Sequence, residues 1–241
     1  MPADTPNPPP AAFARRAIFR FSTAKLLIAL ILLLVFTPFI EDLTNGDTIE
    51  AVLMTLVLVS AVLAVGGRRR SLLAATLLVL PAVAAKWLHH LWPDRVPTGI
   101  HLVAGLLFIA FVVSQLLAFI LRAPRVDSEV LCAGISGFLL VGLLWTLAYV
   151  LVDWVHPGSF SFNVASLGQP RMDGFNGFYY SFMTLCTVGY GDITPVSRVA
   201  RMLAVMEAIT GMFYVAVLIA RLVALHTTAG PINAAEDSRK P

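Results

Sequence analysis

Charged residues are scarce in this sequence. Asp, Glu, Lys and Arg together make up 13% of the chain, hydrophobic residues make up 58%, and the mean hydropathy is +0.83. Soluble domains are typically about 45–50% apolar and about 25% charged. The apolar residues also occur in long blocks between short polar joints, which a single soluble core would not bury. The composition therefore excludes an ordinary soluble domain and predicts an integral membrane protein.

Cysteines are few, and the basic residues are not clustered. Cys132 and Cys186 lie in apolar or pore-associated stretches and not at the spacings of a disulfide framework, so we expect packing residues. The basic residues lie in the polar joints without interleaved aromatics, so the pI of about 9.1 does not indicate a nucleic-acid partner. The first apolar run lacks a small-x-small cleavage pattern, and we expect it to remain in the protein.

Six apolar blocks approach or reach the ~20 residues that a helix needs to cross a bilayer. We expect all-α spans at 25–40, 49–65, 71–92, 99–121, 129–155 and 197–226. Asp127 or Ser128 is expected to cap the fifth helix. The stretch 153–195 is too polar for a further span and too aromatic for a plain loop. It predicts a re-entrant pore segment between the last two helices.

The joint at 122–129 divides the chain, because Pro124 bars a continuous helix there. We expect a disordered, basic cytoplasmic N-terminus at 1–24, a four-helix peripheral domain at 25–123, a pore domain at 128–226 and a short cytoplasmic tail at 227–241. That tail is far below the ~40 residues at which small domains become marginal. Regulation by a nucleotide or calcium would therefore require a separate partner subunit.

The distribution of Lys and Arg predicts the orientation, because positively charged loops stay in the cytoplasm. With the N-terminus inside, twelve of the 17 Lys and Arg residues are cytoplasmic. The five on the outer side are Lys86, Arg95, Arg171, Arg198 and Arg201. We expect a multi-pass protein of the plasma (inner) membrane with both termini in the cytoplasm.

The strongest signal is the run from residue 187 to residue 192, Thr-Val-Gly-Tyr-Gly-Asp. It follows an aromatic amphipathic segment and precedes a long apolar block. The run resembles the selectivity filter of potassium channels, whose backbone carbonyls replace the hydration shell of the ion. The resemblance implies that the carbonyls of Thr187, Val188, Gly189 and Tyr190 bind K⁺, with the Thr187 hydroxyl at the inner end. It is specific over about 174–221 and only architectural over the first four helices.

The physical requirements of such a filter match these residue types. Successive carbonyls must point the same way, whereas an ordinary strand alternates them. Gly189 and Gly191 are therefore expected to adopt left-handed backbone angles, which residues without a Cβ reach readily. One run of carbonyls covers only one side of an ion, and the chain has one such run. Four identical subunits around an axis are thus expected, a homotetramer with closed symmetry.

A pore helix is expected at 176–186, with the negative end of its macrodipole facing a central cavity. The resemblance implies that Tyr179 and Tyr180 brace the filter from outside, with an interfacial aromatic belt as the alternative. It also implies that the Asp192 carboxylate is hydrogen-bonded behind the filter; simple attraction of cations is the alternative. Met183 stands where some relatives carry a glutamate that partners this aspartate.

Glu207 is the one acidic residue deep in a predicted span, where an ionisable group suggests a function. We hypothesise that it accepts hydrogen bonds from Tyr180, Ser181 or Thr184 and steadies the filter. A purely structural polar contact is the alternative.

Gly211 falls where relatives place a hinge glycine, and close packing against the pore helix is the rival interpretation. Met212, Val215 and Ile219 follow at helical spacing. We predict that they line the cavity and the inner gate, with ordinary helix-to-helix core as the alternative.

The fourth span contains no internal arginine, although voltage-gated relatives place arginines at every third position there. Arg122 and Arg125 stand at its cytoplasmic end, where topology accounts for them. We predict weak or absent voltage dependence. His101 and Gln115 are isolated polar residues of this span. They could form a proton-sensitive or polar contact; the alternative is that they are satisfied structural groups. His89 and His90 suggest a pH response or, as the alternative, interfacial anchoring.

The sequence predicts a passive, potassium-selective channel and not an enzyme. The expected partners are three identical subunits and the lipid bilayer, without nucleic acid and with no cofactor beyond the permeant K⁺ ions. The alternatives are a poorly selective cation channel, a subunit of a potassium-uptake transporter and a non-conducting modulatory subunit.

Overall fold

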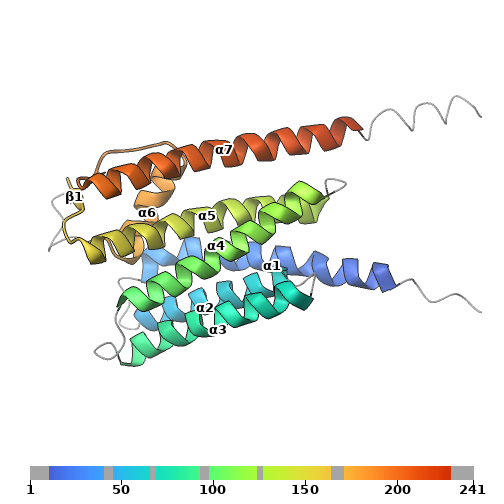
Figure 1. Ribbon diagram of the computed structural model, residues 1–241, viewed down its shortest axis with the longest axis horizontal. Helices are drawn as coiled ribbons and strands as arrows, with labels where there is room; N and C mark the ends of the chain where they lie inside the picture. Colours follow the sequence, from blue (N-terminus) through green and yellow to red (C-terminus); the bar gives the residue numbers. More distant parts are fainter. Residues whose placement is uncertain are drawn as a thin grey trace, which may run out of the picture.

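The computed structural model describes residues 11–40, 46–65, 69–92, 98–123, 127–163 and 171–228. This part of the chain is almost entirely helical (Figure 1). Its elements are α1 (Ala11–Ile40), α2 (Gly46–Val65), α3 (Arg69–Leu91), α4 (Thr98–Arg122), α5 (Ser128–Val155), β1 (Phe160–Phe162), α6 (Gly174–Leu185), β2 (Ile193–Pro195) and α7 (Arg198–Thr228).

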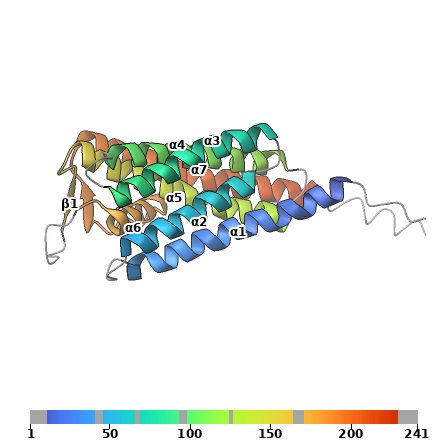
Figure 2. The same cartoon turned by 90° about the horizontal axis from the view of Figure 1, so that it is seen from below.

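The long helices run side by side along one direction (Figures 1 and 2). Helices α1 to α4 form one side of the molecule, and α7 lies on the other. Helix α5 lies between them and packs on both α4 and α1, and the short α6 contacts α5 and α7. The beginning of α1 and the end of α7 lie at one end of the molecule, and β1 lies at the opposite end. Following the orientation predicted from Lys and Arg, the end with β1 is hereafter called the outer end.

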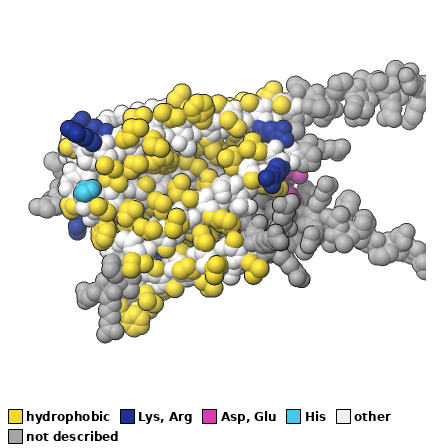
Figure 3. Space-filling view, viewed as in Figure 1, with side chains coloured by type: hydrophobic (Ala, Val, Ile, Leu, Met, Phe, Trp, Pro, Cys, Tyr) yellow, Lys and Arg dark blue, Asp and Glu magenta, His cyan; other side chains and the backbone are white. Residues whose placement is uncertain are grey.

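Within the described residues, three helices are both long enough and apolar enough to cross a membrane: Thr98–Arg122, Ser128–Val155 and Arg198–Ala224. Shorter apolar stretches lie at Thr23–Phe39, Thr48–Ala64 and Leu73–His89. Figure 3 shows hydrophobic side chains over the middle of one face, with Lys and Arg towards its two ends. An apolar band between charged ends is the pattern of a multi-pass membrane protein. The count of six crossings stays a prediction.

The largest core joins the four-helix side to α5. Phe108 and Ile109 of α4 and Leu140 of α5 are fully buried there, together with apolar residues of α1, α2 and α3. Gly142 of α5 makes room for α6, because a Cβ at this position would lie 2.5 Å from Cζ of Phe182. The missing side chain therefore allows the ring of the short helix to lie directly on the long one.

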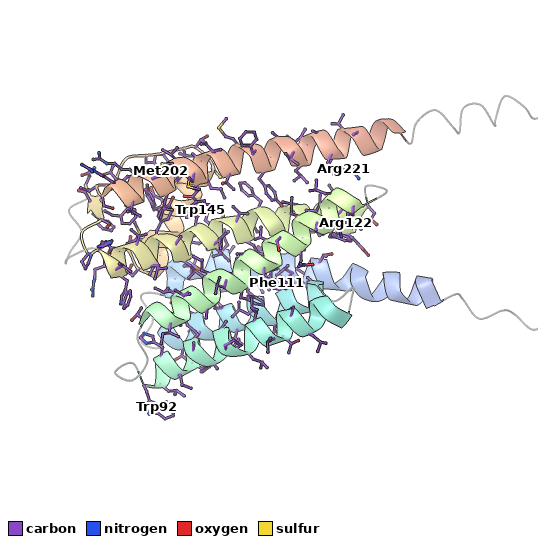
Figure 4. All side chains as sticks on the ribbon, viewed as in Figure 1. Trp92, Phe111, Arg122, Trp145, Met202 and Arg221 are labelled. Atoms are coloured by element: carbon purple, nitrogen blue, oxygen red, sulfur yellow. The ribbon has the colours of Figure 1, made fainter. Side chains whose placement is uncertain are left out.

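Two further contacts fix helix ends. Asp127 is the N-cap of α5, and its Oδ1 accepts a hydrogen bond from the Val130 amide (3.0 Å), so the predicted cap is confirmed. At the other side, Arg221 of α7 donates from Nη2 to the carbonyl of Ala123, just beyond α4 (2.9 Å). Arg122 and Arg221 lie at the same end of the molecule (Figure 4).

The first helix begins earlier than the sequence predicted. Residues 1–24 were expected to be disordered, but α1 already begins at Ala11. Alanine and arginine are abundant in its first turns, and both have high helix propensity, which explains the correction. Helices α2 to α7 lie within a few residues of the predicted ranges. Residues 1–10 and 229–241, Arg125 and the side chain of His90 lie outside the described part.

Strands β1 and β2 were not predicted. They pair antiparallel, with Phe160 opposite Pro195, Ser161 opposite Thr194 and Phe162 opposite Ile193. This pairing places the segment after α5 beside the segment that follows residue 191. It therefore brings together two stretches that are distant in sequence.

Candidate functional site

The segment 187–191 leaves the end of α6 in an unusual backbone conformation. Gly189 and Gly191 have φ of 55° and 79°, as their lack of a Cβ permits. Thr187 also has a positive φ, 58°, which is an outlier for a β-branched residue. Positive φ thus recurs at every second position of this segment. The sequence predicted the two glycines but not Thr187.

Hydrogen bonds to α6 orient the first peptides of this segment. The amides of Val188 and Gly189 both donate to the carbonyl of Met183, at 2.8 Å and 3.2 Å. In a trans peptide the carbonyl points opposite to the N–H of the next residue, and no peptide here is cis. The carbonyls of Thr187 and Val188 therefore both point away from α6. Two consecutive carbonyls with the same direction are what a row of cation ligands requires.

The outer end of the segment is held from two sides. On one side, the Tyr179 hydroxyl of α6 donates to Oδ2 of Asp192 (2.7 Å), and this bond raises the pKa of Tyr179 to about 12. On the other side, Asn163 donates its amide N–H to the Asp192 carbonyl (2.7 Å) and its Nδ2 to the Gly191 carbonyl (2.8 Å). Sequence reasoning missed Asn163, because no motif surrounds it.

Tyr180 lies in an aromatic cluster, whereas Tyr179 bonds to Asp192. Its buried ring stands edge-on to Tyr149 of α5 and to Phe160 of β1, with centroids 4.9 Å and 5.4 Å apart. Edge-to-face arrangements of this kind are favourable beyond the area they bury. The cluster joins α5, β1 and α6 behind the segment 187–191.

Glu207 of α7 is fully buried and bonded to two hydroxyls. Ser181 donates to its Oε1 (2.6 Å), and the Tyr149 hydroxyl donates to its Oε2. The Ser181 oxygen also lies 2.7 Å from the Gly142 carbonyl of α5. The carboxyl group therefore links three helices. Ser181 was among the predicted partners, whereas Tyr149 was missed because it lies 58 residues away in the chain.

Gly211 of α7 packs directly against the end of α6. A Cβ at this position would lie far inside van der Waals contact of the Leu185 carbonyl oxygen, and 2.9 Å from Cδ1 of the same residue. Close packing is therefore a sufficient reason for glycine here. The hinge stays a prediction.

Met212, Val215 and Ile219 are exposed and take no part in the core of the single chain. Only 11% of an 18-residue apolar stretch of α7 is buried, against 44% of the corresponding stretch of α5. Helix α7 thus offers a broad apolar surface that the rest of the described chain does not cover. The assignment of these three residues to a cavity and gate stays a prediction.

The isolated histidines of the outer end lie together. His101 of α4 stacks on His89 of α3, with ring centroids 4.6 Å apart. Nδ1 of His101 is buried and has no hydrogen-bond partner among the residues that the structure describes. These contacts assign no function to either ring.

A short helix that ends at a loop of aligned carbonyls, between two long apolar helices, defines the class of pore-loop membrane channels. The comparisons agree with this class: the ion channel family matches residues 138–227. Protein LctB of Bacillus caldotenax is 30% identical over 100 residues, which cover 41% of this chain and 74% of LctB. The chain therefore belongs to the pore-domain potassium channel family.

Other relatives are longer potassium channels. Two-pore potassium channel 3 of Arabidopsis thaliana is 32% identical over 74 residues, covering 31% of this chain and 16% of that protein. The inward rectifier potassium channel Kirbac3.1 of Paramagnetospirillum magnetotacticum is 30% identical over 99 residues, covering 39% of this chain and 29% of that protein. The chain thus matches less than a third of the length of either channel.

Proposed function

We propose that this chain is one subunit of a homotetrameric potassium channel, in which the segments 187–191 of four chains form the selectivity filter. The observation that carries the proposal is the common direction of the Thr187 and Val188 carbonyls, set by the two amide bonds to Met183. Carbonyl oxygens in a row replace the water around a dehydrated K⁺ ion. They do so without a full negative charge that would hold the ion too tightly.

Tetramerisation follows from the coordination that an ion needs. One chain offers carbonyls from a single direction, so four copies around an axis are required to surround the ion. The surface of α7 supports this assembly, because its 18-residue apolar stretch is only 11% buried in one chain. Tyr190 is also 72% exposed, although its ring is large and mostly apolar. Neighbouring subunits would cover both surfaces.

The remaining site residues then take their roles from position. Tyr179 and Asp192 brace the outer end of the filter, Tyr180 and Glu207 support it from behind, and the C-terminal end of α6 directs its negative dipole at the cation. Met212, Val215 and Ile219 face the central cavity and the inner gate. The chain crosses the plasma membrane six times with both termini in the cytoplasm.

Purified full-length protein in planar bilayers tests this function. With a tenfold K⁺ gradient, the current should reverse near the K⁺ equilibrium potential, about 59 mV for a monovalent ion. Replacing K⁺ by Na⁺ on one side should shift the reversal potential strongly. Equal permeation of Na⁺ and K⁺ would identify a poorly selective cation channel. A stable monomer in lipid would contradict the tetramer and the filter with it.

A further inference from the structure

We propose that Asn163 is a positioning residue of the filter: its side-chain amide holds the Gly191 carbonyl and so ends the column of ion-binding carbonyls at Tyr190. The inference rests on the proposed potassium channel and names what fixes the outer end of its filter. It concerns a residue of the loop after α5, outside the filter motif. The argument starts from how that loop is anchored.

The loop forms what we call the outer strap, residues 156–163. Ser159 fixes its beginning, because its Oγ donates to the His156 carbonyl (2.7 Å) and its amide donates to Oδ1 of Asp153 in α5 (3.2 Å). Phe160 fixes the middle, because its buried ring stands edge-on to Tyr149 and Tyr180. The strap is therefore attached to α5 and α6 before it reaches Asn163.

The strap also pairs with the chain that follows the filter. The carbonyl of Ser159 accepts the Val196 amide (2.8 Å), and the pairing of β1 with β2 continues from Phe160 to Phe162. Asn163 extends this ladder by one bond, from its amide to the Asp192 carbonyl (2.7 Å). Its position along residues 191–192 is thus set by the register of the strands.

The Asn163 side chain then reaches one residue further, to the filter itself. Its Nδ2 donates to the Gly191 carbonyl (2.8 Å). A carbonyl bonded in this way is directed at the strap and not at the ions. With Tyr179 bonded to Asp192 from the side of α6, residues 191–192 lie in a two-sided clamp. We infer that this clamp keeps Tyr190 and Gly191 in the conducting geometry.

Substitution of Asn163, with Asn176 as the matched control, tests the proposal. Asn163→Ala removes the donor, and Asn163→Asp replaces it by an acceptor facing the Gly191 carbonyl. Asn176 is half-buried, and its Nδ2 also donates to a main-chain carbonyl, that of Arg171 (2.9 Å), and to Oδ1 of Asp173 (3.2 Å), at the start of α6. Asn176→Ala therefore removes a similar bond to a main-chain carbonyl, together with one to Asp173, but no bond to residues 187–192 among the described residues.

In bilayers with K⁺, Asn163→Ala should speed the decay of a sustained current by about two- to tenfold, the range expected for one lost hydrogen bond. Asn163→Asp should speed it further and lower the K⁺/Na⁺ permeability ratio, because two oxygens then face each other. Asn176→Ala should behave as the unmodified chain does. If Asn163→Ala and Asn163→Asp match Asn176→Ala in decay and selectivity, the proposal is wrong.

A second measurement does not depend on conduction. Amide hydrogen exchange of the peptide covering 187–193, measured in K⁺-loaded liposomes, should be about two- to tenfold faster in Asn163→Ala than in Asn176→Ala. Faster exchange in protein that passes no K⁺ would uphold the clamp and reject the channel function. Unchanged exchange in a chain that conducts K⁺ would reject the clamp and leave the channel function intact.

Discussion

Gly189 shows how a single residue determines the backbone geometry of the proposed filter. Its φ is 55°, and an Ala at such an angle costs about 1–2 kcal/mol. Gly189→Ala should therefore turn the local peptide, misdirect a carbonyl and abolish K⁺ selectivity. Reversal potentials under opposed K⁺ and Na⁺ solutions measure the effect.

Gly158 provides the matched control for that change. It also has a positive φ, 82°, and it lies in the outer strap with nothing near the place of its Cβ. Gly158→Ala should thus carry a similar backbone cost, read as a lower thermal midpoint, and keep its selectivity. Retained selectivity in Gly189→Ala would show that the left-handed angle is not needed for the filter.

Tyr149 is the second residue to test, through the hydrogen bond that its hydroxyl donates to Glu207. Tyr149→Phe removes one of the two hydroxyls bonded to the buried Glu207 carboxyl and leaves Ser181. It should destabilise the protein by about 1–3 kcal/mol. Because Ser181 lies in α6, selectivity or current decay should change as well. Thermal unfolding and bilayer recording on the same preparation measure both effects.

Tyr214→Phe is the control for Tyr149→Phe. The Tyr214 hydroxyl also joins α7 to α5, donating to the Gly134 carbonyl (2.7 Å), but it makes no bond to α6 among the described residues. It should lower stability by a similar amount without altering the filter. If both variants leave selectivity and decay unchanged, the carboxyl of Glu207 is a structural contact only.

The residues of the site differ in how far the sequence could predict them. Gly189 and Gly191 were predictable because glycine alone reaches positive φ without strain. Thr187 was not, since its own preference opposes the φ of 58° that its bonds to α6 impose. Tyr149 and Asn163 act on partners 58 and 28 residues away. Such contacts follow from how helices and strands pack, which no local pattern contains.

At the scale of elements, the contact between α7 and α6 decides between two interpretations of Gly211. If glycine serves only as a hinge, Gly211→Ala should stabilise the helix by about 0.5–1 kcal/mol and alter opening alone. If it serves packing, the added methyl group meets the Leu185 carbonyl and should destabilise the assembly by about 1–3 kcal/mol or more. The geometry predicts the second outcome.

The thermal midpoint of the reconstituted protein separates the two interpretations of Gly211. A lower midpoint supports close packing. Current decay or selectivity should then be disturbed as well, because the proposed filter follows α6. A midpoint that rises, with only the open probability changed, supports the hinge.

Elements were predictable in proportion to their length. Helices α2 to α5 and α7 follow long apolar runs, so composition alone fixed them within a few residues. Strands β1 and β2 have three residues each, too few for an alternating pattern, and they exist because the strap lies against the chain after the filter. The early start of α1 reflects helix propensity outside the apolar run, which a search for spans does not measure.

At the scale of the whole molecule, α4 lacks the repeated arginines that would sense voltage. The only basic residue in the last turn of α4 is Arg122, and none precedes it in that helix. Lys86 of α3 is paired with Glu50 of α2 (3.0 Å), so their charges largely cancel. Little net charge of α4 and of the Lys86–Glu50 pair is thus available to move through the membrane field.

The open probability should therefore be nearly independent of voltage. One elementary charge that crosses 100 mV contributes about 2.3 kcal/mol, which changes an open-to-closed ratio by about fifty-fold. Without a moving charge in α4, we expect less than about a twofold change between −100 and +100 mV in single-channel recordings. Introducing arginines at Ile100, Val103 and Leu107, exposed residues three or four apart in α4, should add voltage dependence if this helix is coupled to the pore. A steep response of the unmodified chain would show that charge elsewhere, such as the Lys86–Glu50 pair, crosses the field.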